Sequence, residues 1–260
     1  SPSRGLGDVY KRQGLDLALI VNDGPADVVA GVFTTNRVCA APVQWSRHAT
    51  ADHKARAVIV NAAVANACTG IDGFADCDIT FSRVDSDACM STNDTVVAMA
   101  SGASGISLTG DELTDALTEL CAILARQLVA DAEGSHHDVK VTVTGAISTE
   151  AAVAVAREVT RSNLVKTAIA GNDPNWGRIL AAIGCVPENV APFDPDQVDV
   201  SINDIQICKA GGIGEDRNLV DMRPREVHID IELHAGDAEA AVWTNDLTHQ
   251  YVEENSAYTS

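Results

Sequence analysis

Short apolar runs, each ended by turn-forming residues, characterise the first part of the chain. They occupy residues 17–21, 28–33, 57–60 and 96–100. The first run stops at Asn22-Asp23-Gly24-Pro25, and the last stops at the Gly- and Ser-rich residues 101–105. Apolar runs of this length between turn signals predict β-strands.

A long amphipathic helix is predicted near the middle of the chain. Thr109 and Glu112 have the spacing of a capping box, in which each side chain bonds to the backbone N–H group of the other residue. Leucines then recur at helical spacing, at positions 113, 117, 120, 124 and 128. We expect this helix to reach Ala132, with Gly134 closing it.

The second half of the chain alternates between predicted strands and helices. Val139, Val141 and Val143 alternate with polar residues, which indicates a half-buried strand. Ser148 is placed to begin a helix. The elements expected after it are a helix at 149–161, strands at 198–207, 226–233 and 240–244, and a short helix at 247–254. This order predicts an α/β fold, a layered sandwich of mixed sheets and helices, in place of a doubly wound parallel sheet.

The run from Gly171 to Arg178 has two interpretations. Its Asp-Pro pair opens a turn, Gly177 permits close approach, and residues 179–183 predict a short buried helix. Free backbone N–H groups and the Arg178 side chain at such a turn could form a cradle for an anion or a carboxylate. The simpler interpretation is a rigid connection plugged by Trp176, and spacing alone favours it.

Composition and motif content argue against several classes of function. The formal net charge is −19, from 37 acidic and 18 basic residues, which repels nucleic acid and anionic membrane surfaces and favours a cationic substrate. No apolar stretch approaches the length that spans a membrane. The sequence contains neither GxGxxG nor a P-loop, and we expect no cofactor.

Cysteine and histidine positions give little sign of special chemistry. The seven cysteines are scattered without a C-x-x-C pair, so neither zinc nor a disulfide framework is expected, and reduced thiols indicate the cytoplasm. Cys68, in the Ala-rich turn NACTG, would need a nearby base to act as a nucleophile, and a packed small residue is the simpler interpretation. The tandem His136 and His137 lack a second ligand cluster, so we expect a solvated loop without a metal.

Three polar residues are candidates for a ligand site. Glu133 stands at the predicted helix end, where the helix dipole disfavours a carboxylate, so it is a candidate to pair with a substrate ammonium group. A solvated carboxylate is the simpler alternative. The polar tail 251–260 carries two tyrosines, which are unusual in a disordered segment. We therefore expect the tail to dock, with Asn255 and Ser260 available to line a cleft.

Several stretches of the chain are long and distinctive. They are DLALIVNDGPADVVAGVFTTNRVCAAPV from Asp16, NACTG from Asn66 with GFAD, STNDTV from Ser91, ADAEG from Ala130, LVKTAIAGNDPNWGRILAAIG from Leu164, and YVEENSAYTS from Tyr251. Together they resemble the ornithine acetyltransferase family of arginine biosynthesis, and they keep the family's order from Gly14 to Ser260. Residues 1–13 stand apart, because they are basic, show no periodicity and resemble an artefactual leader.

The resemblance implies an acyltransferase that moves an acetyl group from N-acetylornithine to glutamate through an acyl-enzyme. Family members cut themselves before a Thr within a Lys-Gly-x-Gly-Met … Ala-Thr-Met-Leu segment, and that Thr hydroxyl is the nucleophile. A separate Thr-Gly pair supplies the oxyanion hole. The resemblance also implies an oligomer of cleaved α and β chains. It assigns Glu133, Asn255 and Ser260 to positions that hold the amino-acid end of the substrate.

The chain departs from the family at one junction. GFAD, ending at Asp76, runs directly into CDITFSRVD, beginning at Cys77, where the family carries a large central block. That block holds the nucleophile Thr and the oxyanion Thr-Gly pair, and neither Ala49-Thr50 nor Thr69-Gly70 matches them. We therefore assign no catalytic residue. The family fold is expected in two parts, 14–76 and 77–260, incomplete through loss of the central segment.

Three hypotheses for function remain. The first is a family member by descent that is inactive because the nucleophile segment is absent. The second is a non-catalytic fragment that binds amino acids or a partner, and the third, weaker one is an amidohydrolase that uses Cys68. Loss of central strands should also leave sheet edges and apolar surface uncovered, so we expect aggregation or oligomerisation on expression.

Overall fold

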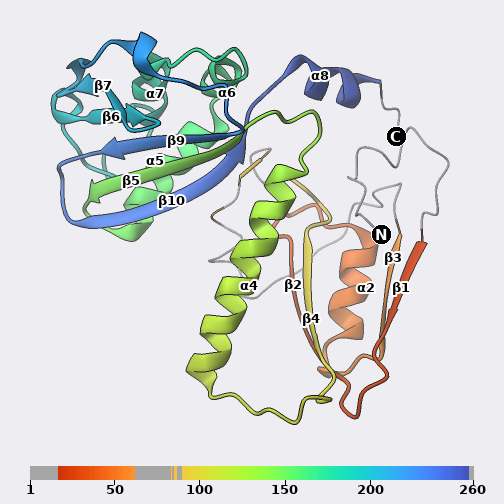
Figure 1. The fold of residues 1–260 in the computed structure, drawn as a ribbon. Coiled ribbons are helices and arrows are strands. Elements are labelled where there is room, and N and C mark those ends of the chain that lie inside the picture. The colour runs from red at the N-terminus through yellow and green to blue at the C-terminus, as the bar shows by residue number, and fades with distance from the viewer. Residues whose placement is uncertain (1–16, 62–82, 84, 87–89, 258–260) are drawn as a thin grey trace. The chain divides into compact units, whose positions relative to one another are not determined.

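The computed structural model describes residues 17–61, 83, 85–86 and 90–257 of the chain. The described residues fall into two compact units, each of which is described by itself. The first comprises residues 17–61 and 90–122, and the second comprises residues 83, 85–86 and 123–257. Figure 1 shows the elements of both units as a ribbon.

The described part of the first unit contains two antiparallel strand pairs. β1 (Leu17–Val21) pairs with β3 (Ala57–Asn61), and β2 (Val28–Phe33) pairs with β4 (Thr95–Ala100). These bounds agree with the predicted strands to within one residue. A helix, α2 (Ala41–Ala49), packs against β2.

The sequence pattern does not predict α2. Its larger apolar residues, Val43 and Trp45, lie two positions apart, which is not a helical spacing, and Trp45 is exposed. The readable signal is Pro42 in the first turn, where the missing N–H group of proline costs nothing. Val43 joins Cys39 and Ala40 in a small buried cluster beside Phe33.

The long helix α4 (Gly110–Ala130) confirms the predicted capping box. The backbone N of Thr109 donates to Oε2 of Glu112 over 2.8 Å, and the N of Glu112 donates to Oγ1 of Thr109 over 3.3 Å. Hydrogen bonds from the backbone and then the hydroxyl of Thr109 lower the pKa of Glu112. The buried residues of α4 are Cys121, Ala125 and Val129, whereas the leucines at 113, 120, 124 and 128 are exposed.

Among the described residues, the second unit is built on a six-stranded sheet in the order β10-β5-β9-β6-β7-β8. β5 and β9 are parallel, and the other neighbouring pairs are antiparallel, so the sheet is mixed as predicted. The strands are β5 (Asp138–Ala146), β6 (Asp199–Ile202), β7 (Ile205–Lys209), β8 (Gly212–Ile213), β9 (Glu226–Glu232) and β10 (Ala238–Asn245).

Helix α5 (Thr149–Arg161) packs on β5 and β10 and also contacts α6 (Asn163–Ala170) and α7 (Trp176–Ile183). The valines at 139, 141 and 143 of β5 are fully buried, whereas the residues that alternate with them are half-buried. Ser148 caps α5 by accepting from the N of Ala151. Short 3₁₀ turns occur at Pro195–Gln197 and Arg217–Leu219, and α8 (His249–Ser256) is the last described helix.

One predicted strand is wrong. Residues 198–207, predicted as a single strand, form β6, a two-residue turn and the start of β7. Asn203 and Asp204 have positive φ angles of 47° and 67°, which matches the turn type that joins tight hairpins and that Asn and Asp tolerate. The remaining predicted elements of this unit occur near their expected bounds, and the α/β class with a mixed sheet is confirmed.

Candidate substrate-binding site

The candidate site lies in the second unit, where α4 ends. Nη2 of Arg225 donates to the carbonyl oxygen of Ala130 over 2.6 Å, and its guanidinium makes hydrogen bonds of 2.9 and 3.0 Å to the carboxylate of Asp138. A cation is favourable here because the last carbonyl groups of a helix carry partial negative charge. Arg225 therefore fixes the direction in which the chain leaves α4, toward Glu133.

Gly134 lets the loop after α4 approach the start of α8. Its φ is +63°, and a Cβ atom at this position would lie 2.4 Å from the backbone N of Tyr251. Glycine alone fits, because any other residue would be strained and would collide with backbone atoms. The close approach places the loop that carries Glu133 beside α8.

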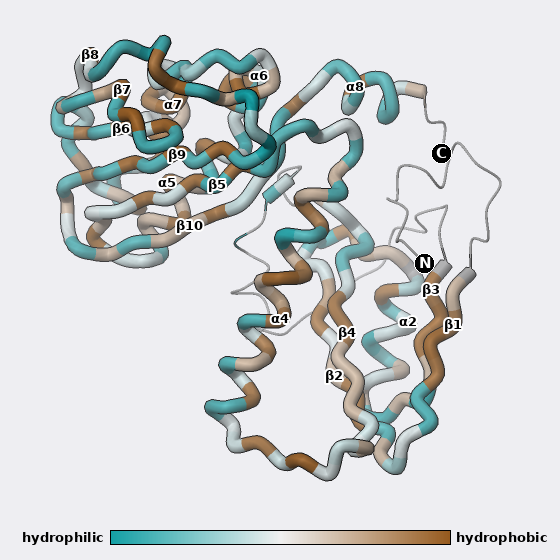
Figure 2. The backbone as a smooth tube through the Cα atoms, viewed as in Figure 1, coloured by the Kyte–Doolittle hydropathy of each residue, from teal (hydrophilic) through white to brown (hydrophobic). Residues whose placement is uncertain are grey.

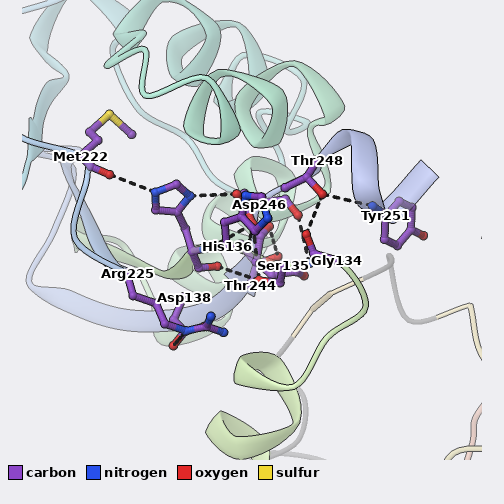
Figure 3. Close-up of polar contacts among 12 residues, drawn as sticks. Gly134, Ser135, His136, Asp138, Met222, Arg225, Thr244, Asp246, Thr248 and Tyr251 are labelled. Carbon is purple, nitrogen blue, oxygen red and sulfur yellow. Dashed lines mark hydrogen bonds and ion pairs between the residues drawn. The ribbon is translucent and has the colours of Figure 1, made fainter. Parts of the chain in front are cut away.

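Asp246 holds the same loop from the end of β10. Its Oδ1 accepts from the N of His136 over 2.9 Å and from the N of His137 over 3.1 Å. Its Oδ2 lies 2.8 Å from Nδ1 of His137, while Nε2 of His137 lies 3.0 Å from the carbonyl oxygen of Met222. Both Asp246 and His137 are buried. Figure 3 shows Asp246 among these contacts, at the centre of the group.

Thr248 connects the loop to α8. Its hydroxyl donates to the carbonyl oxygen of Gly134 over 2.6 Å and accepts from the N of Tyr251 over 3.1 Å, which caps the helix (Figure 3). Both roles of the hydroxyl are thus structural. Thr248 is the hydroxyl residue that bridges the loop and α8, and it is not placed as a nucleophile.

Glu133 and Asn255, two of the three predicted ligand-binding residues, meet at this junction. Nδ2 of Asn255 donates to Oε2 of Glu133 over 3.1 Å and to the carbonyl oxygen of Tyr251 over 2.9 Å. Glu133 is half-buried and Asn255 is exposed. The third predicted residue, Ser260, lies outside the described residues.

This pair offers hydrogen-bond acceptors that a cationic group could use. A carboxylate accepts hydrogen bonds from an ammonium group, and the amide oxygen of Asn255 is a further acceptor. Within residues 17–61, 83, 85–86 and 90–257, no group of three or more His, Cys, Asp or Glu residues could hold a metal ion.

Sequence reasoning misses Asp246 and Thr248, and it is wrong about His137. His136 is exposed, as a solvated loop predicts, but His137 is only 6% exposed. The partners of His137 lie 85 and 109 residues away in the chain, so no local pattern reveals them. Thr248 carries a readable signal, since a Thr before a short helix is a typical cap.

The run from Gly171 to Arg178 forms a rigid connection between α6 and α7, as the simpler interpretation predicts. Nη1 of Arg178 donates back to the carbonyl oxygen of Leu164 over 2.7 Å, and Oδ1 of Asn175 caps α7 by accepting from the N of Arg178 over 3.2 Å. Trp176 packs half-buried against the core. The guanidinium of Arg178 is bound to the backbone of α6, so the structure gives no support to an anion cradle.

Cys68 and the junction between Asp76 and Cys77 lie outside the described residues. Of the cysteines that are described, Cys39, Cys121, Cys185 and Cys208 are free thiols. Burial, and next the nearby charge of Asp199, raise the pKa of Cys208, which keeps that thiol protonated. Among the described residues, no helix has the length and apolar character needed to cross a membrane.

Comparisons with known proteins identify the family. The ArgJ family model matches residues 5–80 and 75–260. The arginine biosynthesis bifunctional protein ArgJ of Bifidobacterium longum is 40% identical over 366 residues, covering 94% of both chains, and that of Streptomyces coelicolor is 37% identical over 362 residues with the same coverage. The crystal structure of ArgJ from Bacillus halodurans superposes with a TM-score of 0.62 at 35% identity, covering 68% of this chain and 87% of the other. The resemblance is confirmed: the chain belongs to the ArgJ family.

Proposed function

We propose that this chain descends from enzymes that transfer an acetyl group from N-acetylornithine to glutamate in arginine biosynthesis. It retains the part of the site that binds the ammonium group of the amino acid, but it does not catalyse the transfer. The observation that carries the binding role is the hydrogen bond between Glu133 and Asn255. The proposed ligands are ornithine, N-acetylornithine and glutamate, and the proposed compartment is the cytoplasm.

The geometry of Glu133 supports an ammonium ligand. Asn255 donates to Oε2, and no described residue donates a hydrogen bond to Oε1, which leaves that oxygen for a ligand. Asn255 also fixes the orientation of the carboxylate, because its amide is held by the carbonyl oxygen of Tyr251. The net charge of −19 favours a cationic group over an anionic one at such a site. Ser260 is proposed as a third ligand-binding residue from its place in the family motif.

The absence of catalysis rests on a missing segment. The chain lacks the family's Lys-Gly-x-Gly-Met sequence and the Thr that follows it. Two findings support loss of a block at this point: the alignment with the Bifidobacterium longum protein spans 366 residues against 260 in this chain, and the two matches to the family model meet at residues 75–80. Without the nucleophile and the oxyanion pair, no acyl-enzyme can form.

Titration calorimetry with ornithine and N-acetylornithine tests the binding role. We expect Glu133→Gln to weaken ornithine binding by about tenfold or more, because a hydrogen bond to a charged partner loses its electrostatic component. Glu254→Gln is the matched control. It also removes one negative charge, on α8, from a side chain that accepts a hydrogen bond from Gln250, whereas the Asn255 side chain donates to Glu133.

Acetyl exchange between N-acetylornithine and glutamate tests the catalytic part separately. We expect no turnover by the purified chain. Measurable exchange would overturn the inactive assignment. No ornithine binding by the wild-type chain, or equal loss of binding in the two Gln variants, would overturn the assignment of Glu133.

A further inference from the structure

Strands β1 and β3 have the sequence of strands that are covered on both faces. Their sequences, LALIV and AVIVN, lack the alternation of a half-exposed strand. In the observed register, Leu19 pairs with Ile59 on one face, and Ile20 pairs with Val58 on the other. Both faces of the β1–β3 pair are therefore apolar, which Figure 2 shows as brown along both strands.

The described residues leave both faces uncovered. Leu19 and Ile59 on one face are 61% and 68% exposed, and Ile20 and Val60 on the other are also exposed. No other described helix or strand packs extensively against β1 or β3, and each strand has one edge without a described neighbour. An isolated two-stranded pair of this kind is at best marginally stable in water. The β1–β3 surface thus has the apolar composition of a protein interior, but no described element covers it.

Relatives in the family contain a segment that this chain lacks, which is large enough to cover β1 and β3 and follows β3 in chain order. The alignment with the Bifidobacterium longum protein spans 366 residues but includes only 94% of the 260 residues of this chain, so about 120 aligned positions have no counterpart here. The matches to the family model meet at residues 75–80, between β3, which ends at Asn61, and β4, which begins at Thr95. In chain order, the absent positions therefore follow β3.

We infer that the β1–β3 pair is a docking surface for a separate polypeptide equivalent to this absent segment. The inference rests on the loss of a central segment in the proposed function. The partner must carry apolar side chains for both faces and a strand that adds to the free edge of β1 or β3, where backbone groups give affinity and side chains give specificity. A segment of about 120 residues is long enough to supply such layers.

A second copy of the chain is a poorer occupant. Each copy carries a net charge of −19, which opposes the self-association that the uncovered apolar surface favours. A second β1–β3 pair also has two uncovered faces of its own, so pairing of two copies would cover one face of each and leave the other exposed. The surface is therefore assigned to the complementary segment.

The test uses the full chain and a tagged polypeptide made of the Bifidobacterium longum residues that align with no residue here, expressed together. Size-exclusion chromatography with light scattering should give a one-to-one complex without any amino acid present. Hydrogen exchange at residues 17–21 and 57–61 should slow by at least about tenfold in the complex, because opening of these strands would require release of the partner.

Ile59→Asp places a charge on the proposed surface and should weaken the complex by at least about tenfold, since a buried unpaired carboxylate is strongly disfavoured. Ile213→Asp is the matched control, because Ile213 lies in β8 of the second unit and is 86% exposed. Its complex should have wild-type affinity. Circular dichroism and tryptophan fluorescence establish that each variant is folded, and the exchange protection in the wild-type chain is read without any variant.

Three outcomes would overturn the inference. One is a chain and a segment that fail to copurify, another is equal weakening by the two Asp variants, and the third is a dimer of this chain that Ile59→Asp dissociates. Ornithine binding is measured on the chain alone through Glu133. Failure of the complex and failure of the amino-acid site are therefore separate results.

Discussion

His137 and Asp246 are 109 residues apart in the chain and pair in the interior of the second unit, with Nδ1 of the histidine 2.8 Å from Oδ2 of the aspartate. The same carboxylate accepts two backbone hydrogen bonds from the loop that carries Glu133. The buried side chain of Asp246, which directly follows β10, thus holds the loop after α4 against the end of that strand. The geometry of the proposed ligand site depends on this pair, although neither residue is expected to touch the ligand.

Asp246→Ala should lower the free energy of unfolding of the second unit by about 3–5 kcal/mol. Removal of one partner from a buried pair leaves the other without compensation, and two backbone donors lose their acceptor as well. Urea denaturation followed by tryptophan fluorescence measures this, since Trp176 and Trp243 lie in this unit. Asp221→Ala, which breaks an ion pair with Arg223 at the surface, is the control. Equal effects of the two variants would show that the buried pair is unimportant.

Gly134→Ala should displace α8 from the loop. The new Cβ would meet the backbone N of Tyr251 at 2.4 Å, and alanine would also have to adopt a φ of +63°. We expect a loss of more than about 1 kcal/mol in unfolding free energy, the conformational penalty alone, with the collision in addition. Hydrogen exchange of residues 249–256 should become faster, and ornithine binding should weaken.

Gly105→Ala separates the conformational penalty of a positive φ from the collision of the added Cβ atom with α8. Gly105 has a φ of +67°, but an added Cβ there would meet no atom within 4 Å. This variant carries the conformational penalty without the collision, so α8 should exchange as in the wild-type chain. If both glycine variants leave the exchange of α8 unchanged, the close approach at Gly134 does not hold the helix.

The sequence predicts elements whose signals are local. The helix over 149–161 follows from Ser148 and its own periodicity, and the valines of β5 follow from simple alternation. The hairpin at Asn203 and Asp204 is missed although the sequence carries a signal for it, because Ile202 and Ile205 are three positions apart, which breaks the alternation, and the two residues between them tolerate positive φ. A strand boundary inside a mostly apolar run is therefore readable only when the alternation is followed residue by residue.

The proposed ligand site is only partly predictable for a different reason. Glu133 stands out in the sequence because the helix predicted to reach Ala132 would set its carboxylate against the dipole, but α4 ends at Ala130, where the guanidinium of Arg225 binds the last carbonyl group. Asn255 is found through a motif. Asp246 gives no local signal, because its function exists only once the end of β10 lies beside the loop after α4. Contacts between residues so distant in the chain follow from the fold and not from the local sequence.

The leucine stripe of α4 gives a third kind of discrepancy. Its spacing predicts an apolar face, yet the leucines at 113, 120, 124 and 128 are exposed among the described residues. The spacing of apolar residues indicates which face of a helix is suited to burial. The exposed fraction of those residues depends on which neighbouring segments are present to cover them. The stripe and the β1–β3 pair agree in this respect, since both carry apolar residues without a described cover.

Arg161→Met should destabilise the second unit by about 3 kcal/mol. Nε of Arg161 donates to Oδ2 of Asp85 over 2.7 Å, and the carboxylate of Asp85 is fully buried. Removal of the guanidinium leaves a buried charge without its counterion. A double-mutant cycle with Asp85→Asn checks the cause, because the neutral amide should recover part of the loss. If the two substitutions are additive in urea denaturation, the ion pair does not contribute to stability.

The charge of Asp199 makes the free energy of unfolding depend on pH in the acid range. Burial raises its pKa, but the hydrogen bond from the N of Ala210, at 2.7 Å, and the contact with His234, at 3.0 Å, outweigh burial and hold the pKa below the ordinary 3.8. A lowered pKa in the folded state means that the unfolded chain takes up the proton first as the pH falls. The stabilisation is therefore fully present above pH 3.8 and is lost as the pH falls through the lower pKa of the folded protein.

Asp199→Asn should lower the unfolding free energy at neutral pH, and this difference from the wild-type chain should shrink as the pH falls below 3.8. The amide still accepts from Ala210, so the substitution removes the charge and leaves the backbone hydrogen bond. Urea denaturation at a series of pH values, followed by circular dichroism, measures the difference. Asp237→Asn, at an exposed residue beyond β9, is the control. A difference between Asp199→Asn and the wild-type chain that stays constant with pH would mean that the charge of Asp199 does not stabilise the fold.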